Sequence, residues 1–288
     1  MSVAGRISVV VPSYNQALFL EATLSSLFSQ DDPDLEVLLI DGGSNDGSLA
    51  VIERWAPRLA FWVSEKDRGQ SHAINKGFDR ASGEWLGWLN SDDLLLPGAL
   101  AALRTKIGTH PDTHWWTGSG HFIDAQGRFL YAYGAPAALR EPAQLSDWRQ
   151  NWIAQPSTFF RRELYDAAGS SVREDLHYAM DLDLWLRLLK LGAPGVLMHE
   201  LSAYRYHDAG KTSAMSVEGE AEIVRVLAEH LGLEMALDRV RLIAADRDEF
   251  LRRAKRYERL LRPLAGPYAK LRRIFRAVRG GDPRPPRS

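Results

Sequence analysis

The chain has 288 residues, no cysteine and a net charge of −1, and 45% of its residues are hydrophobic. This composition suits a globular protein with a sizeable core, and it excludes disulfides, thiolate metal sites and cysteine nucleophiles. No apolar run reaches the roughly 18 residues that a membrane-spanning helix needs. The first residues lack the pattern of a secretory signal, so we expect a cytoplasmic protein.

The first 110 residues alternate between short apolar runs and stretches with helical spacing. Four runs predict buried strands: ISVVVP (7–12), LEVLLID (35–41), LAFWVS (59–64) and EWLGWLN (84–90). Helices are predicted over ALFLEATLSSLF (17–28), SLAVIERW (48–55), HAINKGFDRA (72–81) and PGALAALRTKI (97–107). Such alternation with short links predicts an α/β fold with a Rossmann-like, mostly parallel central sheet flanked by helices.

The pattern changes after about residue 112. HFIDAQGRFLYAY (121–133) predicts a hairpin, YAMDLDLWLRLLKLG (178–192) a helix and GVLMHELSAYRYH (195–207) a strand. We therefore expect one domain over 1–213, with halves of about 1–112 and 113–213. A helical, basic C-terminal extension over 214–280 and a disordered tail over 281–288 would follow it.

Charge is distributed unevenly along the chain. From residue 250 onward there are 13 Lys and Arg but two acidic residues, which gives +11 there and −12 elsewhere. The segment YAKLRRIFRAVRG (268–280) surrounds an apolar helical stripe with basic residues, the pattern of a helix on an anionic membrane surface. Docking on the inner face of a membrane is one interpretation, and a solvated helix or an oligomer contact is the other.

Polar clusters follow three of the predicted strands, at 12–15, 41–46 and 90–93. In parallel sheets, ligands bind outside the carboxyl ends of the strands. These three clusters therefore predict one binding site at one edge of the sheet.

Three carboxylates in these clusters are candidates for ligand binding. The adjacent pair Asp92 and Asp93 suits a divalent cation, since Mg²⁺ is usually held by one or two carboxylates and substrate phosphates. Either residue could instead cap the helix near Pro97. Asp41 could accept a hydrogen bond from a base or a ribose, or it could form a turn into GGSNDG.

Further candidates lie outside these clusters. Asp181 stands near the first turn of a predicted helix, where it could be a general base or simply an N-cap. His207 could add a metal ligand if a loop brings it back, although a lone histidine is more often structural. Arg68, Asn75 and Lys76 could face a phosphate, although Asn75 and Lys76 could instead lie on a helix surface.

Six stretches between residue 7 and about residue 213 form an ordered set: VVVPSYN, LLIDGGSNDGS, SEKDRGQSHAINKG, WLNSDD, QPSTFFRREL and YAMDLDLWLRL. This set resembles the family 2 glycosyltransferases, which are inverting enzymes of the GT-A fold. It is most similar to the bacterial branch that builds surface polysaccharides. The resemblance implies transfer of a sugar from a nucleoside-diphosphate sugar, with UDP favoured, to a glycan or lipid-linked acceptor, assisted by Mn²⁺ or Mg²⁺.

The resemblance also implies roles for individual residues. The nucleotide-sugar pocket would be formed by Pro12, Tyr14, Asn15, Asp41, Arg68, Asn75, Lys76, Asn90 and Asp92. Asp93 and, more loosely, His207 would hold the metal, and Asp181 would be the general base. The sequence departs from the family pattern at Asn90, where an aspartate often opens the DxD motif, and at Met180, the first residue of the usual acidic pair.

Other classes of protein fit the sequence less well. A nucleotide-sugar binding protein without catalysis would keep the pocket residues but would not need Asp181. The acidic body argues against a nucleic-acid partner for the basic tail. A nucleotidyltransferase would need a glycine-rich first loop, which VPSYNQA does not provide.

Overall fold

The computed structural model describes residues 2–136, 139–146, 152–207, 210–211 and 217–245. Residues up to Met235 form one compact unit, which contains every site discussed below. In the second unit, residues 236–245 are helical, and the predicted membrane-binding segment 268–280 lies outside the described residues. None of the described helices is long and apolar enough to cross a bilayer.

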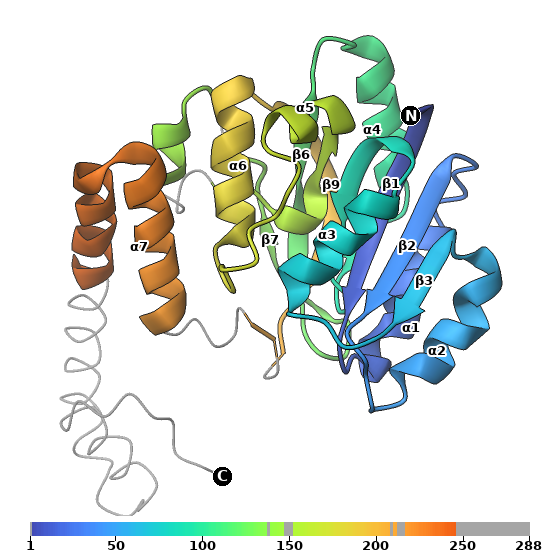
Figure 1. Ribbon diagram of the computed structural model, residues 1–288. Coiled ribbons are helices and arrows are strands. Elements are labelled where there is room, and N and C mark those ends of the chain that lie inside the picture. The colour runs from blue at the N-terminus through green and yellow to red at the C-terminus, as the bar shows by residue number, and fades with distance from the viewer. Residues whose placement is uncertain (1, 137–138, 147–151, 208–209, 212–216, 246–288) are drawn as a thin grey trace, which may run out of the picture. The chain divides into compact units, whose positions relative to one another are not determined.

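The described strands form one sheet in the order β3-β2-β1-β4-β8-β6-β9-β5, with β7 paired to β6 (Figure 1). They are β1 (Val3–Ser13), β2 (Leu35–Asp41), β3 (Phe61–Ser64), β4 (Gly83–Trp88), β5 (Leu94–Leu95), β6 (Trp115–Ile123), β7 (Phe129–Tyr133), β8 (Thr158–Arg161) and β9 (Gly195–Arg205).

The helices are α1 (Ala17–Phe28), α2 (Ser48–Trp55), α3 (Gln70–Arg80), α4 (Ala99–Thr109), α5 (Arg162–Ala167), α6 (Met180–Leu191) and α7 (Val217–Leu231). Short 3₁₀ turns occur at η1 (Ala56–Arg58), η2 (Pro142–Ser146) and η3 (Gln155–Ser157). The predicted α/β fold, with a central sheet flanked by helices and followed by C-terminal helices, is confirmed.

The sheet is parallel in its first half and mixed in its second. β3, β2, β1 and β4 run parallel, whereas β8 is antiparallel to both β4 and β6. Because two antiparallel steps restore the direction, β6 runs the same way as β4, and β9 is parallel to β6. The antiparallel insertion was not predicted, since strand pairing depends on contacts between distant segments. Because of this antiparallel insertion, the same edge of the sheet receives the ends of β1, β2, β3, β4, β6 and β9.

Strands β1 and β2 are covered on both faces, which explains why their sequences are continuous apolar runs. Val9 and Val11 belong to a core cluster with residues of α1, α2 and α4. Val10 lies on the other face, where α3 approaches so closely that a Cβ on Gly77 would come within 2.4 Å of Val10 Cγ1. Figure 1 shows α3 lying across β1 and β2 on this face. The helices therefore hold the strand ends in fixed relative positions.

Candidate active site

A cleft of about 620 Å³ opens at the edge where these strands end. Its walls come from the segments that follow β1, β2, β3 and β4, from the start of α6, and from the end of β9. The convergence predicted from the three polar clusters is thus present. The individual residues of those clusters, however, divide between the cleft and the protein interior.

The segment after β1 lines one wall of the cleft. Pro12 and Tyr14 both face it, and the Tyr14 side chain is 61% exposed. Asn15 does not line the cleft and instead has φ 52°, in the left-handed region that asparagine tolerates. Its Oδ1 accepts the Asn45 N–H at 2.9 Å, and its own N–H donates to Ser44 Oγ at 2.7 Å. Asn15 therefore shapes the wall by joining two loops.

Asp41 is fully buried and faces away from the cleft. Its carboxylate accepts hydrogen bonds from the Gly43 and Ser44 N–H groups at 3.1 and 2.9 Å, and from the Ser64 hydroxyl at 2.7 Å. The turn interpretation of Asp41 thus fits the geometry. These three donors share Oδ2, and Oδ1 accepts the Ser44 hydroxyl, so the buried carboxylate is held in the turn, while its role as a base acceptor stays a prediction.

Asp67 lines the cleft at the place where Asp41 was expected. Its carboxylate lies so close to Gly42 that a Cβ there would come within 2.9 Å of Asp67 Oδ2, and its Oδ1 accepts the Gly69 N–H at 2.8 Å. Asp67 lies within SEKDRG, a stretch that carries the family resemblance, but no pattern singled it out. Lys66, its neighbour, also lines the cleft.

The three candidates for phosphate contact do not line the cleft. Arg68 pairs with Glu174 at 2.7 Å, and Lys76 pairs with Glu65 at 2.5 Å. Asn75 exchanges two hydrogen bonds of 2.8 Å with the backbone of Val172. Each side chain is engaged by a partner outside the cleft, as the helix-surface alternative for Asn75 and Lys76 allows, and the assignment of the three residues to the nucleotide pocket stays a prediction.

Asp92 and Asp93 point in opposite directions. Asp92 lines the cleft, and its Oδ2 lies 3.0 Å from His207 Nε2. Asp93 is 1% exposed; its Oδ1 accepts the Arg205 N–H at 2.8 Å and its Oδ2 accepts the Asn90 amide at 3.2 Å. Burial and the neighbouring Asp92 carboxylate raise the pKa of Asp93 well above its usual value. Metal binding by Asp93 is thus at odds with this geometry, whereas His207 does come back to the acidic pair.

The side chain of Arg205 completes the surroundings of the acidic pair. It donates from Nε to the Asp92 carbonyl at 2.8 Å, and its guanidinium lies 4.9 Å from the ring centroid of Phe19. Its charge compensates two adjacent carboxylates in a region of low solvent access. No pattern in the sequence predicted this role, because Arg205 is more than one hundred positions from the pair.

Asn90 belongs to a chain of amides along the cleft. Its Oδ1 accepts from Gln70 Nε2 at 2.6 Å, its Nδ2 donates to Gln155 Oε1 at 3.1 Å, and Gln155 donates to the Trp88 carbonyl at 2.6 Å. Neutral amides can donate to Asp93 without adding a further negative charge. Asn90 is thus accommodated at the position that departs from the DxD pattern.

Asp181 faces the cleft from the first turn of α6. Burial raises its pKa to about 6, opposed by the Leu182 N–H, which donates to Oδ1 at 2.7 Å, and by the charge of Lys211. Lys211 lines the same cleft and donates to Gln70 Oε1 at 2.8 Å. A carboxylate with this pKa binds protons more strongly than an ordinary aspartate, as a general base requires.

Asp183, two residues along α6, lies in a contrasting environment. It is 1% exposed and accepts hydrogen bonds from Arg187 and His230, both at 2.9 Å. Although burial opposes it, these partners hold the pKa of Asp183 below its usual value. Asp183 therefore connects α6 with α7, whereas Asp181 remains directed at the cleft.

The start of α6 is capped by a residue from another helix. Its N-cap position is Ala179, which has no side-chain acceptor. The Glu222 carboxylate of α7 instead accepts the N–H groups of His177, Tyr178 and Ala179 at 2.7–3.2 Å. These N–H groups belong to the N-cap residue and the two residues before it, so Glu222 ties α7 to the segment that leads into α6 and helps to position the cleft wall that carries Asp181.

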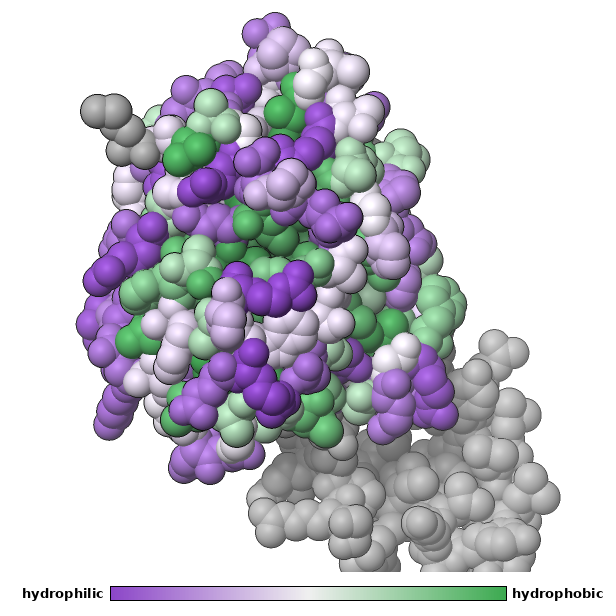
Figure 2. Space-filling model, turned by 90° about the vertical axis from the view of Figure 1, so that its right-hand side faces the viewer, coloured by the Kyte–Doolittle hydropathy of each residue, from purple (hydrophilic) through white to green (hydrophobic). Residues whose placement is uncertain are grey.

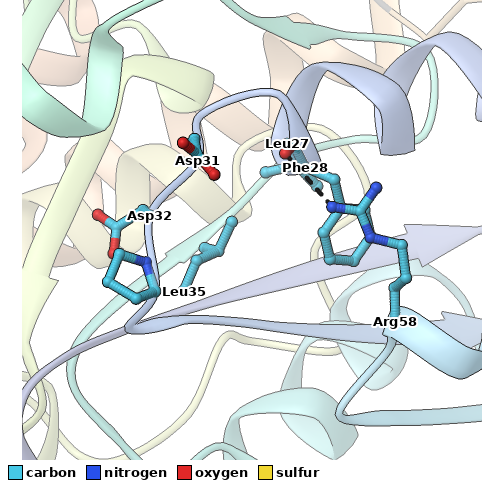
Figure 3. A pocket seen from close by; sticks show the side chains of 7 residues that line it. Leu27, Phe28, Asp31, Asp32, Leu35 and Arg58 are labelled. Atoms are coloured by element: carbon cyan, nitrogen blue, oxygen red, sulfur yellow. Dashed lines mark hydrogen bonds between the residues drawn. The ribbon is translucent and has the colours of Figure 1, made fainter.

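A second, smaller pocket lies away from these residues. Figure 2 shows a face on which hydrophobic residues lie within a hollow and hydrophilic residues surround them. The smaller pocket, of about 290 Å³, is formed where α1 leads into β2 (Figure 3). Arg58 there stacks on Phe28 at 4.3 Å, and the Asp31 and Asp32 carboxylates point away from it. This pocket gathers no set of catalytic groups.

Comparison with known proteins places the chain in a family. Residues 8–167 match the family described as Glycosyl transferase family 2. A glucosyltransferase of Campylobacter jejuni, named GalNAc(5)-diNAcBac-PP-undecaprenol beta-1,3-glucosyltransferase, is 24% identical over 282 residues, 95% of this chain and 85% of the relative. The chain therefore belongs to the family 2 glycosyltransferases, as its six motifs indicated.

Solved structures share the fold. TarS of S. aureus in complex with UDP-GlcNAc aligns with TM-score 0.63 and 20% identity over 81% of this chain and 72% of that one. The mannosyltransferase PcManGT of Pyrobaculum calidifontis, in complex with GDP-Man and Mn²⁺, aligns with TM-score 0.56 and 21% identity over 95% of this chain and 84% of that one. The GT-A-like fold that the resemblance implied is confirmed.

The cap on α6 leads to a testable prediction. Glu222→Ala should lower the transfer rate tenfold or more, because misplacement of a catalytic group by about 1 Å is costly. Binding of UDP, measured by calorimetry, should change little. Acetate should restore part of the rate, since a small carboxylate can accept the same N–H groups.

Glu229→Ala is the matched control for this experiment. Glu229 also lies on α7 and pairs with Arg173, but it does not contact residues 177–179. This variant should lose thermal stability while keeping its rate, and acetate should not affect it. Equal losses of rate in both variants would show that α7 acts only through stability.

Proposed function

We propose that the protein transfers a hexosyl group from a UDP-sugar to a hydroxyl of a glycan or lipid-linked acceptor, with inversion and with the help of a divalent metal. One observation carries the proposal: Asp181, a carboxylate with a raised pKa, faces the same cleft as Asp92 and its neighbour His207. A proton acceptor and a place for the leaving diphosphate are thus available to one substrate.

The donor would lie along the ends of β1 to β4. The exposed Tyr14 ring offers a stacking surface for a base, and Asp67 offers a carboxylate that can accept a base N–H. TarS is in complex with UDP-GlcNAc and PcManGT with GDP-Man. The family resemblance, and the greater likeness to TarS, favour uridine.

A divalent metal would be held by Asp92, which lines the cleft, together with the adjacent His207. A carboxylate oxygen and an imidazole nitrogen meet there at 3.0 Å, a donor pair that Mn²⁺ and Mg²⁺ accept when substrate oxygens complete the coordination. No group of three His, Asp or Glu residues that could hold a metal occurs within the described ranges. When bound, the metal would supply positive charge to the leaving diphosphate.

Asp181 would act on the acceptor. As the acceptor oxygen forms its bond to the anomeric carbon, the bond from that carbon to the diphosphate breaks, and the hydroxyl proton passes to the Asp181 carboxylate. Attack from the side opposite the leaving group inverts the configuration. Desolvation raises the pKa of Asp181 and so makes its carboxylate a stronger proton acceptor.

The biological setting is inferred from the relatives. The Campylobacter jejuni relative is named for an undecaprenol-linked acceptor, and we extend this chemistry to the chain as assembly of a bacterial surface polysaccharide or glycolipid. Peripheral binding of the basic tail to the inner face of a membrane would bring the enzyme to such an acceptor. A non-catalytic nucleotide-sugar binding protein is the alternative, but it would have no use for a raised pKa at Asp181.

Replacement of the proposed base tests the mechanism. Asp181→Asn should bind UDP normally yet lose transfer by a factor of about 10² to 10⁴, the usual contribution of a general base. Its melting temperature at pH 8 should be equal to or higher than that of the wild type. The reason is that an aspartate whose folded pKa is raised costs stability when ionised, and asparagine carries no charge.

Asp183→Asn provides the matched control two residues away. It disturbs the contacts to Arg187 and His230, so the free energy of unfolding should fall by about 3 kcal/mol. The folded fraction should still transfer sugar at a substantial rate. Full activity of Asp181→Asn, measured by donor consumption and product formation, would exclude Asp181 as the base.

The pH dependence of transfer provides a separate test. Because only the ionised base accepts a proton, and the pKa of Asp181 is about 6, the rate should fall about tenfold per pH unit below that value. An ordinary aspartate would keep the rate constant down to about pH 4. Rates measured at saturating donor between pH 4.5 and 8.5 distinguish the two cases.

A further inference from the structure

A row of aromatic rings crosses three neighbouring strands near the cleft. Phe122 of β6 lies opposite Tyr204 of β9 and opposite Tyr131 of β7 in the strand register. The ring centroids of Phe122 and Tyr131 are 4.7 Å apart in a stacked arrangement, and those of Phe122 and Tyr204 are 5.2 Å apart. Trp152 stacks on Phe122 at 5.8 Å. We call Tyr204, Phe122, Tyr131 and Trp152 the aromatic row.

The aromatic row begins inside the cleft and ends on the surface. Tyr204 lines the cleft together with Asp181. Tyr131 is 56% exposed and belongs to β7, which pairs only with β6 among the described strands. Cross-strand aromatic pairs also stabilise sheets, but that role does not require the outermost ring to face solvent.

We propose that the aromatic row is the binding surface for the acceptor, and that the acceptor portion it binds is a carbohydrate whose sugar rings stack on Tyr204 and Tyr131. The proposal rests on the proposed transferase function and adds the chemical class of the acceptor near the reacting hydroxyl. Continuity with the cleft supports it, because an acceptor that presents a hydroxyl to Asp181 must pass the wall that Tyr204 forms.

The chemistry of the row favours a sugar over a hydrocarbon chain. A pyranose has a face of C–H groups and an edge of hydroxyls. Tyrosine matches both, since its ring is apolar and its phenol accepts and donates hydrogen bonds. Rigid aromatic rings next to a cleft that also carries charged and amide side chains are typical of sites that orient a polar ligand. An alkyl chain would gain nothing from the phenols of Tyr131 and Tyr204.

Saturation-transfer NMR on the full chain with dodecyl maltoside below its micelle concentration tests the assignment, because this probe contains both candidate chemistries. Aromatic protons are irradiated in the presence of UDP and Mn²⁺. We expect saturation to reach the ring protons of the maltose and not the dodecyl chain. Octyl glucoside serves as a second probe with a single sugar, and should give a weaker signal of the same kind.

Tyr131→Ala should weaken binding of dodecyl maltoside about three- to tenfold, the range of one aromatic stacking contact. Phe129→Ala is the matched control, because Phe129 is 62% exposed on the same strand but contacts His121 rather than the aromatic row. This variant should bind as the wild type does. Both variants should keep their UDP signal.

Three results would overturn the proposal. They are saturation confined to the dodecyl chain, equal weakening by both substitutions, and no saturation of either probe while UDP still binds. In the first case the row would hold a lipid. Failure of the proposed function would look different, because the wild type would then either lack the UDP signal or bind UDP without consuming donor and forming product in a transfer assay.

Discussion

The cleft depends on the hydrogen bonds that the buried carboxylate of Asp93 accepts. This carboxylate accepts the Arg205 N–H from the end of β9 and the amide of Asn90 from the segment after β4, and so it joins the two halves of the sheet. A carboxylate in such surroundings is stable only with its hydrogen bonds intact. With Asp93 held inward, Asp92 is directed into the cleft, where it meets His207. The geometry proposed for the metal therefore follows from a residue that does not itself face the ligand.

A similar division of roles occurs on α6. Asp181 and Asp183 are two residues apart, yet burial without a direct cationic partner raises the pKa of the first, while Arg187 and His230 lower that of the second. The partner His230 and the capping residue Glu222 both lie on α7. This helix follows the matched family region at 8–167. It nevertheless supports the wall that carries the proposed base, and it belongs to the same compact unit, which extends to Met235.

The sequence predicted the fold class and the meeting of strand ends, because apolar runs and short links are local features. It did not predict which side chains face the cleft. Adjacent residues in an extended segment point to opposite sides, so Asp92 and Asp93 could not be told apart without their partners. For a related reason the sequence did not show which partners engage Arg68 and Asn75, since Glu174 and Val172 approach them from about one hundred positions away. Asp67 lies within the motif SEKDRGQSHAINKG, and Arg205 lies within the predicted strand 195–207. No pattern singled out either residue.

The central claim is that Asp92 and a divalent metal bind the diphosphate of the donor in this cleft. Thermal unfolding of the wild type and of Asp92→Asn, each with UDP alone and with UDP plus Mn²⁺, tests it most directly. A ligand that binds only the folded state raises the melting temperature. We expect the melting temperature of the wild type to rise clearly with UDP and Mn²⁺ together and only slightly with UDP alone. In Asp92→Asn, Mn²⁺ should not raise the melting temperature further. Equal stabilisation with and without metal, or an unchanged Mn²⁺ effect in the variant, would contradict this claim.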